Sequence, residues 1–224
     1  MKILILVTSH AMLGDTGTRT GLWLEELAVP YLTFTRAGAT VDLASPLGGA
    51  VPIDPKSEQD PSADVKAFLA DSKAMAAVKA SKKVADVGTG YDAVFVAGGH
   101  GTMWDLPASP DVAAALSSAW QQGTVVAAVC HGPAALVNVK DAKGQPIVKG
   151  RRFTAFTNEE EAAVGLTKVV PFLLESRLVE LGGRFERAPR WQSHAVRDGK
   201  LVTGQNPASS RAVAEQVLTA LRER

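Results

Sequence analysis

Cys130, the only cysteine of the 224-residue chain, is the side chain whose position in the sequence most favours covalent chemistry. It follows the small apolar run 125–129, which predicts a buried strand. It precedes Gly132 and Pro133, which end that strand before residues 134–137 can open a helix. A cysteine at such a strand-to-helix turn lies beside backbone N–H groups, as in a nucleophile elbow, and these groups favour the reactive thiolate. The alternative interpretation is a small buried hydrophobe.

The histidine and the glycine loop near this turn are candidates for acid–base and oxyanion roles. His131 directly follows the cysteine, so it either accepts the thiol proton as a general base or packs beneath the turn. Residues 98–101, Gly-Gly-His-Gly, end another predicted strand, and glycine there lets backbone N–H groups approach a ligand closely. The amides of this loop and of His131 are therefore candidates for an oxyanion hole, and a simple turn is the alternative. The loop lacks the G-x-G-x-x-G spacing of a dinucleotide site.

Two groups of glutamates supply candidate carboxyl groups. Glu25 and Glu26 lie among apolar residues of a predicted helix, so we expect one of them to face the core, where burial raises its pKa. The alternative is two solvated helix residues. Glu159, Glu160 and Glu161 open a second predicted helix, where acids are expected, and one of the three can orient His131. The four histidines lack H-x-x-x-H spacing, and we predict no metal.

The elements that must position these side chains alternate along the chain. The predicted strands cover residues 2–9, 40–44, 91–97, 125–129, 152–156 and 201–204, and the predicted helices cover 21–36, 64–87, 109–122, 159–182 and 209–222. Pro30 should kink or end the first helix. The alternation predicts an α/β fold with a mostly parallel central sheet and helices on both faces. Ligands of such sheets bind at the carboxyl ends of strands, where Cys130 and the 98–101 loop both fall.

Composition and charge narrow the class of protein. The chain is 46% hydrophobic and 21% charged, as is usual for a globular domain, and we expect one domain with a modest insertion around residues 46–90. The net charge of +1 gives no reason to expect nucleic acid or an anionic membrane as partner. One cysteine leaves no internal disulfide and favours a reducing, cytoplasmic location. The apolar run 3–7 is too short for a signal peptide or a membrane span.

With these motifs taken in order, the chain resembles the ThiJ/PfpI superfamily, whose members have a class I glutamine-amidotransferase-like fold. The resemblance is strongest to its glyoxalase III-like and heat-shock chaperone-like branch. The motifs that carry it are Thr20-Gly21 with Glu26 and Pro30, Pro52-Ile53-Asp54-Pro55, Tyr91–Val94 leading into Gly98–Gly101, Asp105-Leu106-Pro107, Ala128–Pro133 and Gly199–Pro207. The resemblance implies a three-layer, flavodoxin-like domain with a nucleophile elbow, spanning residues 1–224, and a homodimer.

The resemblance also implies roles for individual residues. The family's nucleophilic cysteine falls on Cys130, the histidine beside it on His131, and the acidic partner of that histidine on Glu161. The glutamate beside the thiol falls on Glu26, and the oxyanion donors fall on the amides of Gly99 and His131. No cofactor is implied. Glu159 and Glu160 stay open as alternatives to Glu161.

The function that follows is a glutathione-independent, cofactor-independent glyoxalase III-type lyase, which converts methylglyoxal-like 2-oxoaldehydes into 2-hydroxy acids through a Cys130 hemithioacetal. The alternatives on the same scaffold are a stress chaperone that binds unfolded proteins, a protein deglycase and a redox sensor. A cysteine peptidase or amidase is a less favoured alternative, because it needs an open cleft for a chain substrate. Glutamine hydrolysis is disfavoured, because the late histidine, His194, is followed by Ala195-Val196 instead of Pro-x-Glu.

Overall fold

A seven-stranded sheet forms the centre of the molecule in the computed structural model, which describes residues 1–223. Its strands are β1 (Lys2–Leu6), β2 (Thr40–Ser45), β3 (Lys82–Lys83), β4 (Ala93–Val96), β5 (Val125–Val129), β8 (Ala195–Asp198) and β9 (Leu201–Gly204). They lie in the order β3-β2-β1-β4-β5-β9-β8, and every neighbouring pair is parallel except β8 and β9. Strands β6 (Arg152–Phe153) and β7 (Arg184–Phe185) form a separate parallel pair. The predicted α/β fold with a mostly parallel sheet is confirmed.

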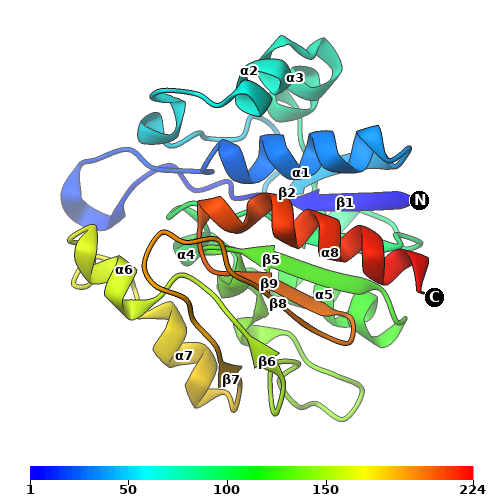
Figure 1. The fold of residues 1–224 in the computed structure, drawn as a ribbon, viewed down its shortest axis with the longest axis vertical. Coiled ribbons are helices and arrows are strands. Elements are labelled where there is room, and N and C mark those ends of the chain that lie inside the picture. Colours follow the sequence, from blue (N-terminus) through cyan, green and yellow to red (C-terminus); the bar gives the residue numbers. More distant parts are fainter. Residues whose placement is uncertain (224) are drawn as a thin grey trace.

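Helices cover both faces of this sheet (Figure 1). They are α1 (Glu25–Arg36), α2 (Ala63–Ala70), α3 (Ser72–Lys79), α4 (Thr102–Asp105), α5 (Pro110–Gln121), α6 (Asn158–Ala163), α7 (Leu174–Glu180) and α8 (Ser210–Arg222). Short 3₁₀ helices cover Gly14–Thr16, Pro55–Glu58, Val84–Asp86, Gly132–Asn138 and Pro207–Ser209. Alternate residues of β1 point to opposite faces, so Ile3 and Ile5 join the core under α1 and α8, whereas Leu4 and Leu6 join the core under α5.

The first predicted helix begins later than the sequence pattern indicates and continues past its proline. Residues 21–24 are not helical, because Leu22 pairs with the segment after β2: its N–H donates to Pro52 O at 2.8 Å and its carbonyl accepts from Asp54 N at 2.9 Å. Helix α1 then runs through Pro30 to Arg36, so Pro30 does not end the helix, and the predicted alternative of a kink at Pro30 stays a prediction.

The helix predicted over residues 64–87 is two helices followed by a strand. Asp71 ends α2 in an extended conformation and caps α3, since its Oδ1 accepts from the N–H groups of Lys73 and Ala74 at 2.9 and 3.0 Å. After α3, Lys82 and Lys83 pair with the end of β2 as an edge strand. A local side-chain cap therefore overrides the helix propensity of the surrounding residues.

The C-terminal half differs from its prediction in three further places. The strand predicted over 152–156 is hydrogen-bonded as a strand only at Arg152–Phe153, and the helix predicted over 159–182 is interrupted between α6 and α7. The antiparallel strand β8 was not predicted. Its signal was Asp198-Gly199, a dipeptide typical of tight hairpins, and Gly199 has a φ of +60°.

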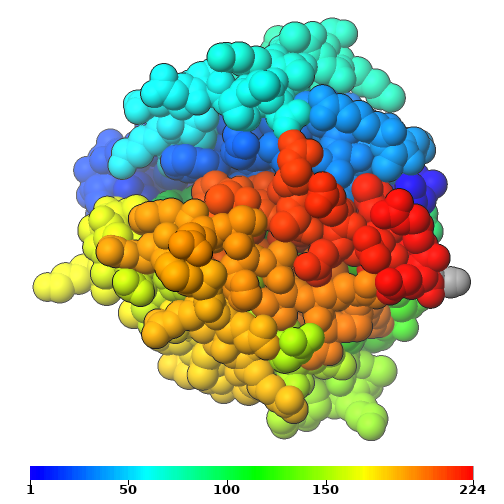
Figure 2. Space-filling view, in the orientation of Figure 1, coloured from blue at the N-terminus to red at the C-terminus, as the bar shows by residue number. Residues whose placement is uncertain are grey.

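The carboxyl ends of the parallel strands meet at one edge of the sheet, where the loop after β4, the turn after β5 and helix α6 come together (Figure 1). In the space-filling view the C-terminal part of the chain, orange to red, fills the centre of the near face, and the segments of α1, α2 and α3 border it above (Figure 2). Nowhere in residues 1–223 does a helix combine the length and apolar character that crossing a membrane needs.

Candidate active site

Cys130 lies on a strained turn directly after β5. Its φ of +58° is in the left-handed region, which residues other than glycine rarely adopt. Two backbone hydrogen bonds hold the turn: Cys130 N donates to Gly204 O and Phe156 N donates to Cys130 O, both at 2.9 Å. A Cβ on Gly132 would lie 2.4 Å from Val96 O, so the turn needs glycine there. The segment after the turn, where a helix was predicted, is the 3₁₀ helix Gly132–Asn138. A strained backbone at Cys130 is characteristic of a functional site.

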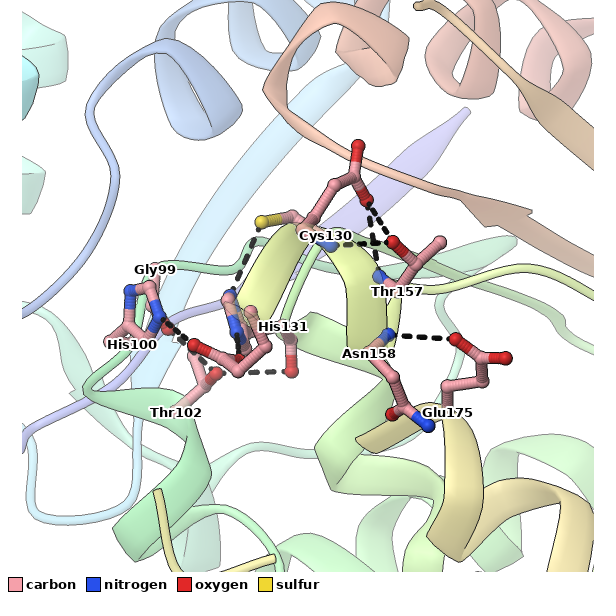
Figure 3. A network of polar contacts seen from close by, with 10 residues as sticks. Gly99, His100, Thr102, Cys130, His131, Thr157, Asn158 and Glu175 are labelled. Atoms are coloured by element: carbon pink, nitrogen blue, oxygen red, sulfur yellow. Dashed lines mark hydrogen bonds and ion pairs between the residues drawn. The ribbon is translucent and has the colours of Figure 1, made fainter. Parts of the chain in front are cut away.

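The thiol faces an imidazole that is itself held by a carboxylate (Figure 3). Cys130 Sγ lies 3.3 Å from His131 Nδ1, and His131 Nε2 lies 2.7 Å from Glu161 Oε2. All three residues are buried. Because a carboxylate only accepts hydrogen bonds, the imidazole proton is on Nε2, and the Nδ1 lone pair is directed at the thiol. His131 is therefore oriented to accept the thiol proton.

The charge states of this pair are set by burial and by mutual contacts. Burial, followed by the charge interaction with His100, lowers the pKa of His131 to about 4, against the opposing effect of Glu161. Burial alone would raise the pKa of Glu161, but the charge and the hydrogen bonds of the two histidines outweigh it and lower that pKa to about 2. At neutral pH the imidazole is neutral and the carboxylate is ionised.

Glu26, from the first turn of α1, lies beside the thiol with the opposite charge state. Its Oε2 accepts from Gly98 N at 2.8 Å, and its Oε1 has no hydrogen-bond partner within residues 1–223. Burial raises the pKa of Glu26 to about 8, although contacts with the Cys130 thiol and the Gly98 amide oppose the rise. Burial, followed by the charge of Glu26, also raises the pKa of Cys130 well above its usual range. The resting site thus has a neutral thiol and a protonated Glu26.

The glycine loop packs tightly against both of these groups. A Cβ on Gly98 would lie 2.5 Å from Glu26 Oε2 and 2.8 Å from His131 N, and a Cβ on Gly99 would lie 2.3 Å from Gly21 O. Gly99 also has a φ of +102°, so glycine is required there by conformation and by space. The His131 amide interacts with Cys130 and lowers its pKa, the effect expected of an oxyanion donor. The role of Gly99 as a second donor stays a prediction.

The three glutamates at the start of α6 have three different environments. Glu161 contacts His131, whereas Glu159 is exposed and forms an ion pair with Arg190 at 3.2 Å. The structure therefore brings together Cys130, His131, Glu26 and Glu161, and it leaves Glu159 out of the site.

Glu160 is a buried residue of this region that the sequence analysis left without a function of its own. Its Oε2 accepts from Thr157 N and Thr157 Oγ1, both at 3.1 Å, which completes a capping box for α6. Its Oε1 accepts from Trp191 N at 2.9 Å, Gln205 Nε2 at 3.1 Å and Asn206 Nδ2 at 2.9 Å. Glu160 thus fixes α6 to the loops around β8 and β9. The available signal was the pair of amide residues that follow the last predicted strand.

His100 is a second residue that the sequence analysis did not place in the site. Its Nε2 lies 2.9 Å from Glu161 Oε1, and its ring centroid lies 4.0 Å from that of His131. The available signal was a histidine within a glycine loop at a strand end. The two histidines and Glu161 place potential metal ligands within 4.8 Å of one another. A metal would have to replace both imidazole–carboxylate hydrogen bonds, since Zn–N distances are about 2.0–2.1 Å.

The sequence and the fold of this chain are similar to those of known proteins. The family model described as DJ-1/PfpI family matches residues 20–220. The glutathione-independent glyoxalase HSP31 of Saccharomyces cerevisiae is 33% identical over 99% of this chain and 98% of its own. The crystal structure of glyoxalase III from Candida albicans is 31% identical and superposes with a TM-score of 0.91, covering 98% and 97% of the two chains. The Rapid Encystment Protein 24 kDa of Francisella tularensis is 41% identical, with a TM-score of 0.95 and 98% of each chain covered.

Proposed function

The chain belongs to the DJ-1/PfpI family, and from that premise we propose that it is a glutathione-independent glyoxalase that converts methylglyoxal-like 2-oxoaldehydes into 2-hydroxy acids. The observation that carries the proposal is the arrangement around Cys130: its thiol lies 3.3 Å from the Nδ1 of an imidazole whose Nε2 is held by Glu161, and Glu26 lies on its other side. The directions of the pKa shifts support a neutral thiol, a neutral imidazole and a protonated Glu26. This pairing of a base and an acid around one nucleophile suits addition to a carbonyl group, which needs a proton removed and a proton supplied.

In the first step, the Cys130 sulfur adds to the aldehyde carbon. His131 Nδ1 takes the thiol proton, and Glu26 gives its proton to the aldehyde oxygen. The amides of Gly99 and His131 stabilise negative charge as it develops on that oxygen. The product is a hemithioacetal, with Glu26 left as a carboxylate and His131 as an imidazolium.

In the second step, a proton moves between the two substrate carbons. Glu26 removes the proton from the former aldehyde carbon while His131 protonates the ketone oxygen, which gives an enediol. Glu26 then delivers its proton to the former ketone carbon, and His131 takes the hydroxyl proton from the sulfur-bearing carbon. The result is a thioester of the 2-hydroxy acid. Because no electron leaves the substrate, the rearrangement needs no redox partner.

Hydrolysis closes the cycle. Glu26 takes a proton from water, whose hydroxide adds to the thioester carbon, and His131 returns its proton to the departing sulfur. The net change is methylglyoxal plus water to lactic acid, and the thiol, Glu26 and His131 all regain their resting protonation. Glu161 orients His131 throughout and stabilises its imidazolium form through the 2.7 Å contact with Nε2.

The test is methylglyoxal consumption without glutathione, with lactate assayed as product and the thiol confirmed as reduced. The wild type should turn over, and Cys130→Ser and Cys130→Ala should both lose turnover while they keep the melting temperature of the wild type. Full activity in Cys130→Ser would overturn the mechanism. A wild type with no turnover would overturn the proposed activity and favour a chaperone, sensor or hydrolase on the same scaffold.

A further inference from the structure

One carboxylate serves two imidazoles in this site. Glu161 Oε2 lies 2.7 Å from His131 Nε2, and Glu161 Oε1 lies 2.9 Å from His100 Nε2, so the Nε2–H groups of both rings donate to the same carboxylate. The rings themselves lie 4.0 Å apart, tilted by 42°. Only one of these histidines also contacts the thiol. His100 is thus placed to act on the thiol only through Glu161 and His131.

The backbone holds His100 in this position firmly. The preceding Gly99 lies against the segment before α1, and Trp23 N donates to Gly98 O at 3.2 Å. Thr102 Oγ1 lies 2.8 Å from Gly99 O and 3.0 Å from His131 O, and so links the loop to the cysteine turn. The His100 side chain is 13% exposed, whereas that of His131 is 1% exposed. The shared contact is therefore built into the fold.

The electrostatic consequence is competition for one negative charge. Glu161 acts to raise the pKa of His131, and positive charge on His100 acts to lower it. The other ionisable groups that affect or face His131 are Glu160, also from α6, and the Cys130 thiol, with Glu26 of α1 beside that thiol. Without His100, Glu161 would serve His131 alone, and a thiolate–imidazolium pair would be favoured over the neutral thiol and imidazole.

We propose that His100 is a positioning residue which occupies one oxygen of Glu161 and thereby keeps His131 a neutral base beside a neutral thiol. The inference rests in part on the proposed function, since the neutral imidazole is the base of that mechanism. The effect of His100 on the ionisation of the Cys130 thiol can be measured without any turnover.

The experiment measures the rate at which iodoacetamide alkylates the protein as a function of pH, followed by intact mass. Cys130 is the only cysteine, so the signal reports this thiol alone, and Cys130→Ser gives the blank. His100→Gln keeps an amide N–H donor for Glu161 but cannot be protonated, and His100→Leu removes the donor as well. His10→Gln is the matched control, because His10 stacks on Trp104 and does not contact Glu161.

We expect the pH midpoint of alkylation to fall in His100→Leu, so that the rate near pH 6 rises about tenfold, the equivalent of about one pKa unit. His100→Gln should shift in the same direction by less, and His10→Gln should match the wild type. In methylglyoxal turnover, the acid limb of the kcat/KM profile should move to higher pH in both His100 variants, because His131 becomes more basic.

A midpoint in both His100 variants equal to that of the wild type, with melting temperatures preserved, would overturn the proposal. If His100→Leu does not fold, the conservative His100→Gln decides the question alone. Absence of glyoxalase activity in the wild type would refute the proposed function but not this inference, since the alkylation shift would still be present or absent. A purely structural role for His100 would lower stability and leave the midpoint unchanged.

Discussion

Two buried glutamates on either side of the cysteine turn have opposite charge states. Glu26 of α1 has its pKa raised to about 8, and Glu161 of α6 has its pKa lowered to about 2. Burial acts in the same direction on both. The difference lies in the donors: Glu26 accepts one backbone N–H at one oxygen and contacts a neutral thiol, whereas Glu161 accepts an imidazole N–H at each oxygen. The number and charge of hydrogen-bond donors therefore decide which carboxyl group is an acid and which is a fixed anion.

The largest effect is expected when Glu26 loses its ionisable proton and keeps its shape. Glu26→Gln retains an oxygen for Gly98 N but cannot donate a proton to the aldehyde or shuttle one between the carbons. We expect kcat for methylglyoxal to fall about 10³-fold, within the range of about 10²–10⁴ that general acid–base groups contribute. The measurement is lactate formation at saturating substrate.

The control for that variant is Glu25→Gln. Glu25 is the neighbouring helix residue, and its Oε2 accepts from Ser62 Oγ at 2.8 Å, outside the thiol site. It should keep its activity. An unchanged rate in Glu26→Gln would assign the proton transfer to His131 alone.

The second prediction concerns the dependence of stability on pH. The pKa of Glu26 is about 8 in the folded protein and 4.5 by its ordinary value, so the folded state holds its proton more tightly. Its contribution to stability is complete below about pH 4.5 and is lost as pH rises towards 8. The free energy of unfolding in urea should therefore fall by about 4 kcal/mol between pH 5 and pH 8.5 in the wild type, and by much less in Glu26→Gln. Equal slopes in the two proteins would contradict the raised pKa.

The two carboxyl groups also differ in how much of their role the sequence predicted. Glu26 could not be distinguished from Glu25 by helical spacing, because apolar residues flank both, and only the family resemblance selected it. The sequence could distinguish in part among Glu159, Glu160 and Glu161. Thr157 and Glu160 have capping-box spacing, which assigns Glu160 to the helix end and leaves Glu161 to face inward.

What the sequence did not predict depends on contacts between distant segments. The turn at Cys130 could be predicted from local signals, because an apolar run ended by Gly-Pro marks the end of a buried strand. Such signals suffice where the backbone alone sets the geometry. The contact between His100 and Glu161 joins residues 61 positions apart. It exists because the sheet order places the ends of β4 and β5 side by side next to α6, and no periodicity of one segment encodes that order.

The smallest of the expected effects concerns the ionised carboxylate of Glu161. Its pKa is lowered to about 2, so its contribution to stability is present above about pH 4.5 and is lost as pH falls towards 2. In Glu161→Gln one amide oxygen has to serve two imidazole N–H groups, and one donor is left without its charged acceptor. We expect a loss of about 2 kcal/mol at pH 7 that shrinks on acidification, measured by urea unfolding at pH 7 and pH 3.5. Glu159→Gln is the matched control: within residues 1–223 the Glu159 carboxylate forms its ion pair with exposed Arg190, so its loss should change stability by about 0.5 kcal/mol or less. A loss in Glu161→Gln that grows towards low pH would mean that Glu161, like Glu26, is held in its protonated form, and the contrast between the two carboxyl groups would disappear.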